Sequence, residues 1–262
     1  MMATVLDKIV SRTRQHVEAA KSHLEESQLR DRLDDAPPIR SFFDALADDQ
    51  DAVSLIAEIK KASPSQGLIR ADFDPVGIAR IYEAAGASCI SVLTDEPYFQ
   101  GSLDYLRQVR QAVDIPLLRK DFVIDSYQVL EARAAGADAV LLIAECLDDC
   151  HLRKLHNEIV ALGMTPLVEF YEPENLPRVL EAGATLVGVN NRNLKTMEVD
   201  IEHTIRMRGE IPSDCFVVGE SGIETRDDVA RLRSAGVDAM LVGTSLMKQT
   251  DLSAAVTALI GD

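Results

Sequence analysis

Acidic and basic side chains stand at or near the ends of several short apolar runs. Glu58 and Lys60 lie two residues apart in the run S-L-I-A-E-I-K, so their side chains point to the same side of an extended strand. Lys120 and Glu169 lie at or near the ends of other runs. Similar positions are taken by Asn190, Arg192, Glu220 and Ser221. Amines and carboxylates that share a cavity can give and take protons, so the pattern predicts acid–base chemistry.

Two glycine-containing turns predict an anion site. The segments G-E-S-G-I and V-G-T-S-L-M follow two successive apolar runs, and the second opens a short helix. Backbone amides at such turns bind phosphate when a helix begins behind them, although each glycine alone is also compatible with an ordinary turn. The predicted phosphate contacts are Gly222, Gly243 and Thr244. In an acidic protein a bound phosphate needs nearby positive charges, and the candidates are Lys60, Lys120 and Arg192.

Eight apolar runs rich in Val, Ile and Leu must position these side chains. Their near-continuous apolarity is typical of parallel strands buried on both faces. Segments with helical spacing separate them, for instance 75–85 and 126–135, and this alternation predicts strand–helix units. The runs span 54–60, 89–94, 116–120, 139–145, 166–170, 186–191, 216–221 and 239–244.

A repeated phrase, A-G-A or A-G-V, ends four of the intervening helices. Its glycines, Gly86, Gly136, Gly183 and Gly236, are 50, 47 and 53 residues apart, which is the length of two strand–helix units. Eight parallel strands in one unit predict an α/β fold, a closed (β/α)₈ TIM barrel, with its chemistry at the carboxyl ends of the strands. An open doubly wound sheet is the alternative, which the absence of a dinucleotide-binding glycine fingerprint after the first run disfavours.

The first residues lie outside this repeat. We expect residues 1–50 to form an N-terminal helical extension that packs on the barrel, and residues 51–262 to form the catalytic barrel domain. The segment 41–46 predicts a short helix, and the charge-rich stretch 20–36 is expected to be mobile. The apolar face of a first helix would consist of Val5, Leu6, Ile9, Val10 and Val17.

The composition excludes several classes of function. The 262 residues include 27 Lys and Arg against 43 Asp and Glu, and the net charge of −16 disfavours nucleic acid as a partner. No apolar run approaches the roughly 18 residues of a membrane span, and no signal peptide is visible. Four scattered cysteines suit thiols in a reducing cytoplasm. The sequence leaves the oligomeric state open, and a monomer is compatible with it.

The stretch I-A-E-I-K-K-A-S-P-S-Q-G at 56–67 resembles the signature of the indole-3-glycerol phosphate synthase family, barrel enzymes of tryptophan biosynthesis. The resemblance covers about residues 5–255, with motifs in the family's order on seven of the eight strands. The further motifs are S-V-L-T-D-E-P-Y-F-Q-G (91–101), L-L-R-K-D-F (117–122), L-V-E-F (167–170), G-V-N-N-R-N-L (188–194), G-E-S-G-I (219–223) and V-G-T-S-L-M (242–247).

This resemblance implies a carbon–carbon lyase reaction. Its substrate, 1-(2-carboxyphenylamino)-1-deoxyribulose 5-phosphate, closes to indole-3-glycerol phosphate with loss of CO₂ and water, and with no metal or organic cofactor. By the same resemblance Lys120 is the acid that protonates the developing alkoxide, and we expect burial and nearby Lys60 to lower its pKa. Lys60 would hold substrate anions and donate a proton during dehydration. Glu58 and Glu169 would transfer protons.

The resemblance assigns further residues to the site. Asn190 and Arg192 would hold substrate hydroxyls and the adjoining loop. The phosphate contacts that it implies are Ser63, Gly222, Gly243 and Thr244. Glu220 and Ser221 would line the site. The apolar clamp for the anthranilate ring would be Phe99 and Phe122, for which ordinary loop packing is the alternative.

Glu145 departs from the small or apolar residues usual after the fourth strand, and we expect it to point away from the site or to be paired. Two other functions stay open on the residues alone. One is another phosphate-binding barrel, such as an aldolase with a Schiff base on Lys60 or Lys120. The other is a non-catalytic barrel that binds a phosphorylated metabolite or a protein. A binder has little use for a buried carboxylate beside its cations, so Glu169 favours an enzyme.

Overall fold

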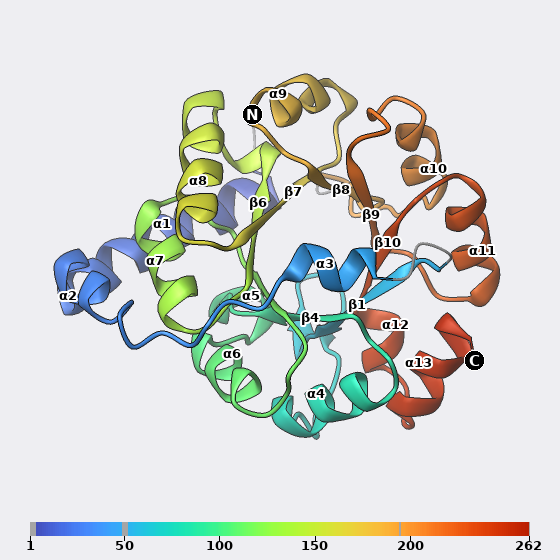
Figure 1. Ribbon diagram of the computed structural model, residues 1–262, viewed down its shortest axis with the longest axis horizontal. Coiled ribbons are helices and arrows are strands. Elements are labelled where there is room, and N and C mark those ends of the chain that lie inside the picture. Colours follow the sequence, from blue (N-terminus) through green and yellow to red (C-terminus); the bar gives the residue numbers. More distant parts are fainter. Residues whose placement is uncertain (1–3, 49–51, 194, 262) are drawn as a thin grey trace.

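The computed structural model describes residues 4–48, 52–193 and 195–261. Its centre is a closed barrel of eight parallel strands (Figure 1), which confirms the predicted TIM barrel and its eight strands. The expected boundary between extension and barrel, at residues 50 and 51, lies outside the described residues. The barrel strands are β1 (Ser54–Ile59), β4 (Cys89–Leu93), β5 (Leu117–Lys120), β6 (Ala139–Ile143), β7 (Thr165–Phe170), β8 (Leu186–Asn190), β9 (Phe216–Glu220) and β10 (Ala239–Val242).

Strand β1 closes the ring by pairing with both β4 and β10. The other strands pair with their neighbours in chain order, so all carboxyl ends meet at one end of the barrel. Between β1 and the first outer helix the chain adds a small hairpin that the apolar pattern does not predict. Its strands are β2 (Ala62–Ser63) and β3 (Gly67–Leu68).

Helices surround the barrel, and several of them begin at short polar side chains that cap their first turn. The Asp125 carboxylate, for example, accepts a hydrogen bond from the amide of Tyr127 at 2.8 Å. The four repeat glycines have φ between 79° and 96°, which confirms their left-handed position after a helix. The surrounding helices are α4 (Pro75–Ala84), α5 (Glu96–Phe99), α6 (Leu103–Arg110), α7 (Ser126–Ala134), η1 (Ala144–Cys146), α8 (Asp149–Ala161), η2 (Pro173–Asn175), α9 (Leu176–Glu181), α10 (Glu202–Arg208), α11 (Arg226–Ser234), α12 (Thr244–Met247) and α13 (Leu252–Ile260).

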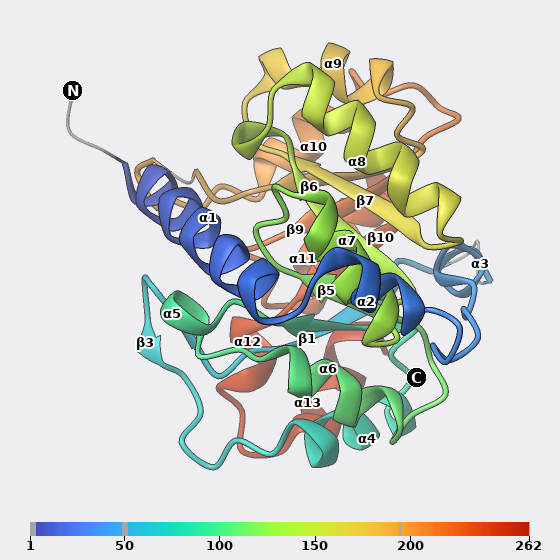
Figure 2. The same ribbon diagram turned by 90° about the vertical axis from the view of Figure 1, so that its left-hand side faces the viewer.

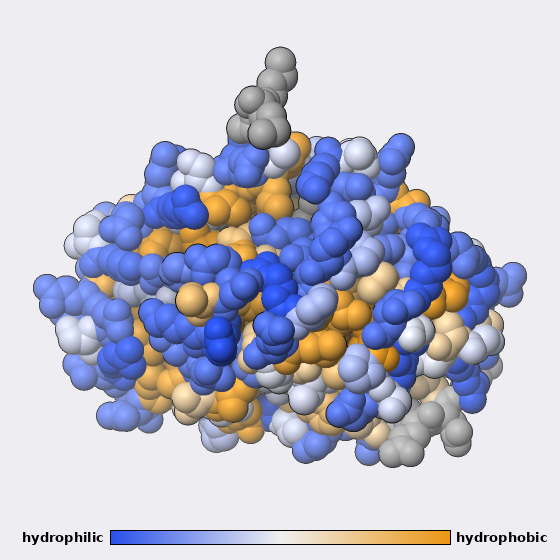
Figure 3. Space-filling model, turned by 90° about the horizontal axis from the view of Figure 1, so that it is seen from above, coloured by the Kyte–Doolittle hydropathy of each residue, from blue (hydrophilic) through white to orange (hydrophobic). Residues whose placement is uncertain are grey.

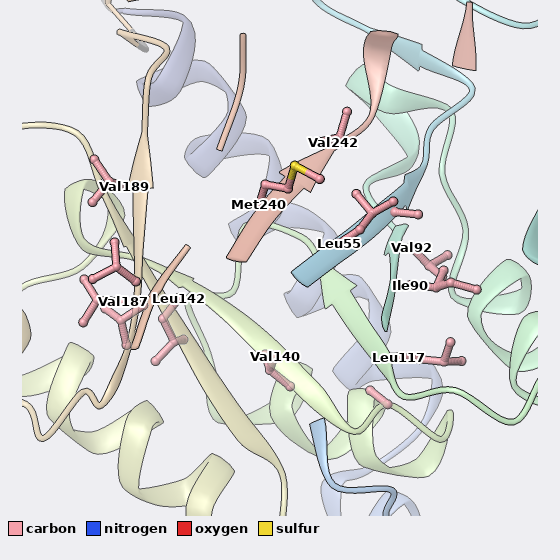
Figure 4. Close-up of a cluster of buried hydrophobic side chains, with 14 of the residues drawn as sticks. Leu55, Ile90, Val92, Leu117, Val140, Leu142, Val187, Val189, Met240 and Val242 are labelled. Atoms are coloured by element: carbon pink, nitrogen blue, oxygen red, sulfur yellow. The ribbon is translucent and has the colours of Figure 1, made fainter. Parts of the chain in front are cut away.

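Two apolar layers explain why the strand runs are almost continuously hydrophobic. Val187 and Val189 of β8, like Leu142 of β6, belong to the outer layer that packs against the helices (Figure 4). Alternate residues such as Leu141 and Leu167 belong to a separate cluster inside the barrel. A strand that contributes to both layers needs apolar residues on both faces.

Helix α3 (Phe42–Ala47) closes the barrel at the amino ends of its strands, and it lies across the front of the barrel in Figure 1. Phe42 and Leu46 are buried with inward-facing residues such as Ile56. The Ser54 hydroxyl, at the start of β1, donates to the carbonyl of Leu46 at 2.7 Å. The short helix predicted at 41–46 is therefore confirmed. The structure adds that this helix acts as a plug of the barrel.

Helix α1 (Val5–His23) lies at the opposite end from α3 (Figure 2). Thr4 caps its start, and its side chain accepts from the amide of Asp7 at 3.1 Å. Ile9, Val10 and Val17 are buried, as the predicted apolar face requires, whereas Val5 in the first turn is exposed and does not fit this prediction. The N-terminal segment thus touches both ends of the barrel.

The expectation that residues 20–36 are mobile is wrong. Helix α2 (Glu26–Asp31) buries Leu29 in a cluster with Tyr127 and Leu130 of α7. The Tyr127 hydroxyl also donates to the carbonyl of Leu24 at 2.9 Å. Contacts with a distant helix, and not a local pattern, fix this charged stretch.

The outer surface mixes polar and apolar side chains. On the face shown in Figure 3, hydrophilic side chains separate the apolar patches. Within the described ranges, no helix is both long and apolar enough to pass through a bilayer. Scattered apolar surface of this kind is ordinary for a folded domain. In a TIM barrel the functional site lies at the carboxyl ends of the strands.

Candidate active site

A cavity of about 270 Å³ opens at the carboxyl ends of the barrel strands. All fourteen residues predicted for the site line it, although they are widely separated in the sequence. They are Glu58, Lys60, Ser63, Phe99, Lys120, Phe122, Glu169, Asn190, Arg192, Glu220, Ser221, Gly222, Gly243 and Thr244. The barrel therefore brings the polar strand ends and the glycine turns together in one place.

Lys120, the last residue of β5, stands between two glutamates. Its Nζ donates to Glu169 Oε2 at 2.6 Å and to Glu220 Oε2 at 3.0 Å. Burial by itself would lower the pKa of Lys120. The nearby carboxyl groups, above all those of Glu169 and Glu220, outweigh burial and raise this pKa above its ordinary value. The expectation of a lowered pKa is wrong, because carboxylates and not Lys60 are the nearest charged neighbours of this ammonium.

Glu169 and Glu220 have opposite protonation preferences, although both side chains are only 2% exposed. Burial would raise the pKa of Glu169, yet Lys120 and a hydrogen bond of 2.8 Å from Asn190 lower it. Burial, opposed by Lys120 and reinforced by Glu169, raises the pKa of Glu220 to about 8. The ammonium thus lies between one carboxyl group that gives up its proton readily and one that holds its proton more strongly. Such a cluster can both donate and accept protons.

Glu58 and Lys60 form a second ion pair at the end of β1, with side chains 5% and 13% exposed. Gly243, directly after β10, leaves the room in which the Glu58 carboxylate sits, since a Cβ at this position would overlap it. Gly243 therefore has a packing role besides the predicted contact with phosphate. Each of the two lysines has a buried carboxylate of its own.

The loop after β8 is tied to the same cluster. Asn190, which bonds Glu169, accepts a hydrogen bond from the amide of Arg192 at 2.9 Å. The Arg192 guanidinium donates to the carbonyl of Met197 at 3.1 Å, and burial lowers its pKa. Leu194, the last residue of the predicted motif, lies outside the described residues. The loop can hold a substrate through Arg192 without losing its connection to Glu169.

Two turns form the end of the cavity beside β9 and β10. Ser221 and Gly222 adopt left-handed φ angles of 68° and 76°, and α12 begins directly after Gly243. The Ser245 hydroxyl connects the turns by donating to the carbonyl of Ile223 at 2.9 Å. Paired turns in front of a helix are the arrangement that the anion-site prediction requires.

Sequence reasoning missed a cation at this end of the cavity. Lys248 lines it, and its Nζ donates to Gln66 Oε1 at 2.9 Å, which connects the β2–β3 hairpin to the end of α12. Its spacing from Thr244, one helical turn, is the signal that could have revealed it.

Apolar side chains form the remaining wall. The rings of Phe99 and Phe122 lie 6.1 Å apart between centroids, at an angle of 39°. Leu6 and Ile9 of α1 line the cavity beside them, a role that sequence reasoning did not assign to this helix. Together they provide a surface suited to a flat aromatic ring.

Glu145 is paired, as expected. Its Oε1 accepts from the amides of Tyr171 and Glu172 at 2.8 and 3.0 Å. The Asn175 side chain donates to the same oxygen at 2.8 Å. Glu145 therefore stabilises the turn after β7.

Comparison with known proteins decides to which family this barrel belongs. The family model described as indole-3-glycerol phosphate synthase matches residues 6–259. The chain belongs to the indole-3-glycerol phosphate synthase family. The synthase of Rhodopirellula baltica is 55% identical over 257 residues, which cover 98% of this chain and 99% of the relative. That of Leptothrix cholodnii is 49% identical over 262 residues, with 98% and 99% covered.

Membership confirms the predicted activity: this indole-3-glycerol phosphate synthase family member is a carboxy-lyase of tryptophan biosynthesis that acts on a phosphorylated small molecule. Among solved structures, a 3-hexulose-6-phosphate synthase is similar with a TM-score of 0.64 and 15% identity, covering 79% of this chain and 98% of that one. A thiamine phosphate pyrophosphorylase from Pyrococcus furiosus has a TM-score of 0.59 at 18% identity, with 80% and 95% covered. At such identities the likeness shows the fold alone.

Proposed function

We propose that this site closes the indole ring of 1-(2-carboxyphenylamino)-1-deoxyribulose 5-phosphate with Lys120 as the acid. The observation that carries the proposal is the position of Lys120 Nζ, bonded to Glu169 and Glu220 on the wall of a cavity that also holds two glycine turns. The surrounding carboxylates keep the amine charged, so it enters the reaction as an ammonium.

Ring closure needs one proton. The aryl carbon that bears the carboxylate attacks the ketone carbon, and the carbonyl electron pair moves to oxygen. A developing alkoxide is basic enough to take a proton from Lys120 in spite of the raised pKa of this lysine. Loss of CO₂ then returns its bonding pair to the ring and restores aromaticity. Glu220, protonated below about pH 8, can return a proton to Lys120.

Loss of water needs a second acid and a base. The new hydroxyl leaves as water after taking a proton, while the adjacent CH₂ gives up a proton and the indole double bond forms. We assign the acid to Lys60 and the base to Glu58, because the two are ion-paired at a different wall of the cavity. Over both stages two protons reach the oxygen and one leaves carbon, so the departure of CO₂ and water balances.

The other lining residues bind the substrate in this proposal. The two turns and the hairpin hold its phosphate, while Phe99 and Phe122 exclude water from the cationic ring. Asn190, Arg192 and Ser221 hold its hydroxyls. The phosphate contacts are Ser63, Gly222, Gly243 and Thr244.

One chain suffices as a catalytic unit in this proposal, and a cytoplasmic location is part of it. All fourteen proposed residues belong to one chain, and the four cysteines are free thiols, as is usual in a reducing compartment. The net charge of −16 supports a small molecule over nucleic acid as the partner. The division into an extension at 1–50 and a barrel at 51–262 belongs to the same proposal.

Incubation of the purified protein with this substrate tests the proposal. Indole absorbance and CO₂ release should rise together. Lys120→Met should reduce both by about 10² to 10⁴-fold, whereas Lys154→Met, at a lysine 60% exposed on α8, should leave both unchanged. A parent protein that forms no indole would refute the proposed function.

Lys60→Met separates the two acid–base pairs. If Lys60 serves the loss of water, this variant should release CO₂ faster than it forms indole, because the decarboxylated alcohol accumulates. An equal loss of both products would place Lys60 before decarboxylation and contradict the division of roles.

A further inference from the structure

The middle of β8 lacks a side chain beside the charged cluster. Gly188 lies between Val187 and Val189, which pack outward against the helices (Figure 4). Because side chains alternate along a strand, position 188 faces the barrel interior. A Cβ added there would lie 3.3 Å from Glu169 Cα of the neighbouring strand and 3.4 Å from Cδ1 of Leu167, which belongs to the inner cluster.

The carboxyl group of Glu220 occupies the space at Gly188, since an added Cβ would overlap Glu220 Oε1. In the register of the two strands Glu220 pairs with Asn190, so its side chain reaches from that level across to position 188. Glu220 Oε1 is buried without a hydrogen-bond partner among the described residues. This oxygen therefore lies in the space that the missing Cβ of Gly188 leaves, and no described hydrogen bond holds it there.

The second oxygen of the same carboxyl group faces the acid of the reaction. Glu220 Oε2 accepts from Lys120 Nζ at 3.0 Å, so the carboxyl group is held between Lys120 on one side and Gly188 on the other. A glutamate has several rotatable bonds, and a recess of fitted size restricts them. Glycine inside a strand otherwise weakens it, so its presence here needs a packing reason.

We propose that Gly188 is a positioning residue whose missing side chain forms the recess that seats the Glu220 carboxyl group against Lys120. A methyl group at this position would force the carboxyl group towards the cavity and displace the ammonium that it bonds. This inference rests on the proposed roles of Lys120 and Glu220. It adds the reason why a glycine occupies this strand position.

Gly188→Ala tests the recess, and Gly219→Ala is its matched control. Gly219 lies on the neighbouring strand β9, and its added Cβ would meet Thr204 and Leu232 of the outer layer at 3.3 and 3.6 Å. Gly188→Ala should lower kcat about 10²-fold, because a shift of about 1 Å at the acid has such an effect. KM should stay within about threefold and the control within about twofold of the parent kcat, since neither change touches the phosphate turns.

Repeating the substitution in a Glu220→Ala background separates positioning from general damage. There Gly188→Ala should change kcat by less than about twofold, because the carboxyl group that it displaces is gone. An equal loss in both backgrounds would overturn the proposal. So would a Gly188→Ala variant with the kcat of the parent.

Urea unfolding supplies a readout that is independent of activity. Gly188→Ala should lower the unfolding midpoint of the parent and leave that of the Glu220→Ala background unchanged. If the parent forms no indole, the proposed function fails while this comparison still decides the inference. A single variant that does not fold supports the recess if the double variant folds, and failure of both to fold would overturn it.

Discussion

Replacing Lys120 with methionine should make barrel stability depend more steeply on pH than it does in the parent. Methionine is similar in length but removes the ammonium that bonds Glu169 at 2.6 Å and Glu220 at 3.0 Å. In the parent the pKa of Glu169 is lowered, so this carboxyl group is ionised at neutral pH in both the folded and the unfolded chain. Without the ammonium, burial dominates and raises the pKa of Glu169 above its ordinary value, so the folded variant takes up a proton there.

Proton linkage gives the magnitude. Glu220, with a pKa of about 8, contributes a similar pH dependence to parent and variant below that value. A proton that the folded variant binds at Glu169 and the unfolded variant does not changes the free energy of unfolding by about 1.4 kcal/mol per pH unit. A group whose folded pKa is raised stabilises the fold at low pH, and this contribution is lost as the pH rises towards that pKa. Between about pH 5.5 and about pH 7.5 the variant should therefore lose up to about 2.7 kcal/mol relative to the parent, the full amount if Glu169 stays protonated in the folded variant throughout this range.

Urea unfolding followed by circular dichroism at the two pH values measures this difference. Lys154→Met, which removes an exposed lysine of the same length, should follow the parent at both values. A difference between Lys120→Met and the parent that does not change with pH would refute Lys120 as the neutralising partner of Glu169. Undiminished indole formation by this variant would remove Lys120 from the mechanism.

Two further substitutions probe the phosphate turns and the N-terminal segment. Gly243→Glu should raise the Kd of the substrate by about tenfold or more, because it displaces the Glu58 carboxylate and adds a second negative charge at a turn that contacts the phosphate. Calorimetric titration measures this, and an affinity equal to that of the parent would contradict the assignment. Tyr127→Phe should reduce the free energy of unfolding by about 1 kcal/mol, because its hydroxyl no longer donates to the carbonyl of Leu24. Its kcat should equal that of the parent, and a large loss of turnover would show that this anchor also shapes the site.

The barrel, and the site residues at its strand ends and glycine turns, were predictable because they depend on local patterns, whereas Ser63, Phe99 and Phe122 were predicted only from the resemblance to the family. Strands buried on both faces need apolar residues at nearly every position, and Gly86 and Gly136 mark helix ends with left-handed φ angles. Once eight parallel strands are recognised, their carboxyl ends must meet. This is why Lys120 and Glu169, 49 positions apart, could be placed in one cavity before their contact was known.

The electrostatics of the site could not be predicted, because they depend on distances between strands. Adjacent residues Arg119 and Lys120 are both basic, yet Arg119 does not line the cavity and bonds Asp121 at 2.9 Å, while Lys120 lines it and bonds Glu169. Charge type alone would make two neighbouring lysines lower each other's pKa. The observed carboxylates reverse the direction for Lys120. Helix α2 was missed for a similar reason, since its six residues depend on the distant partners of Leu29.

The route of residues 4–48 has a consequence for biosynthesis. Phe42 of the plug packs in one cluster with Ala239 of β10, the last barrel strand to leave the ribosome. Because the chain is synthesised from its N-terminus, helix α3 leaves the ribosome almost 200 residues before strand β10, which completes the barrel end that α3 covers. During that interval Phe42 and Leu46 lack part of the cluster that buries them in the folded chain, and we expect them to be available to chaperones. High contact order at this point makes docking of the plug a late event in folding, so damage to the plug should limit the yield of folded chains before it affects their catalysis.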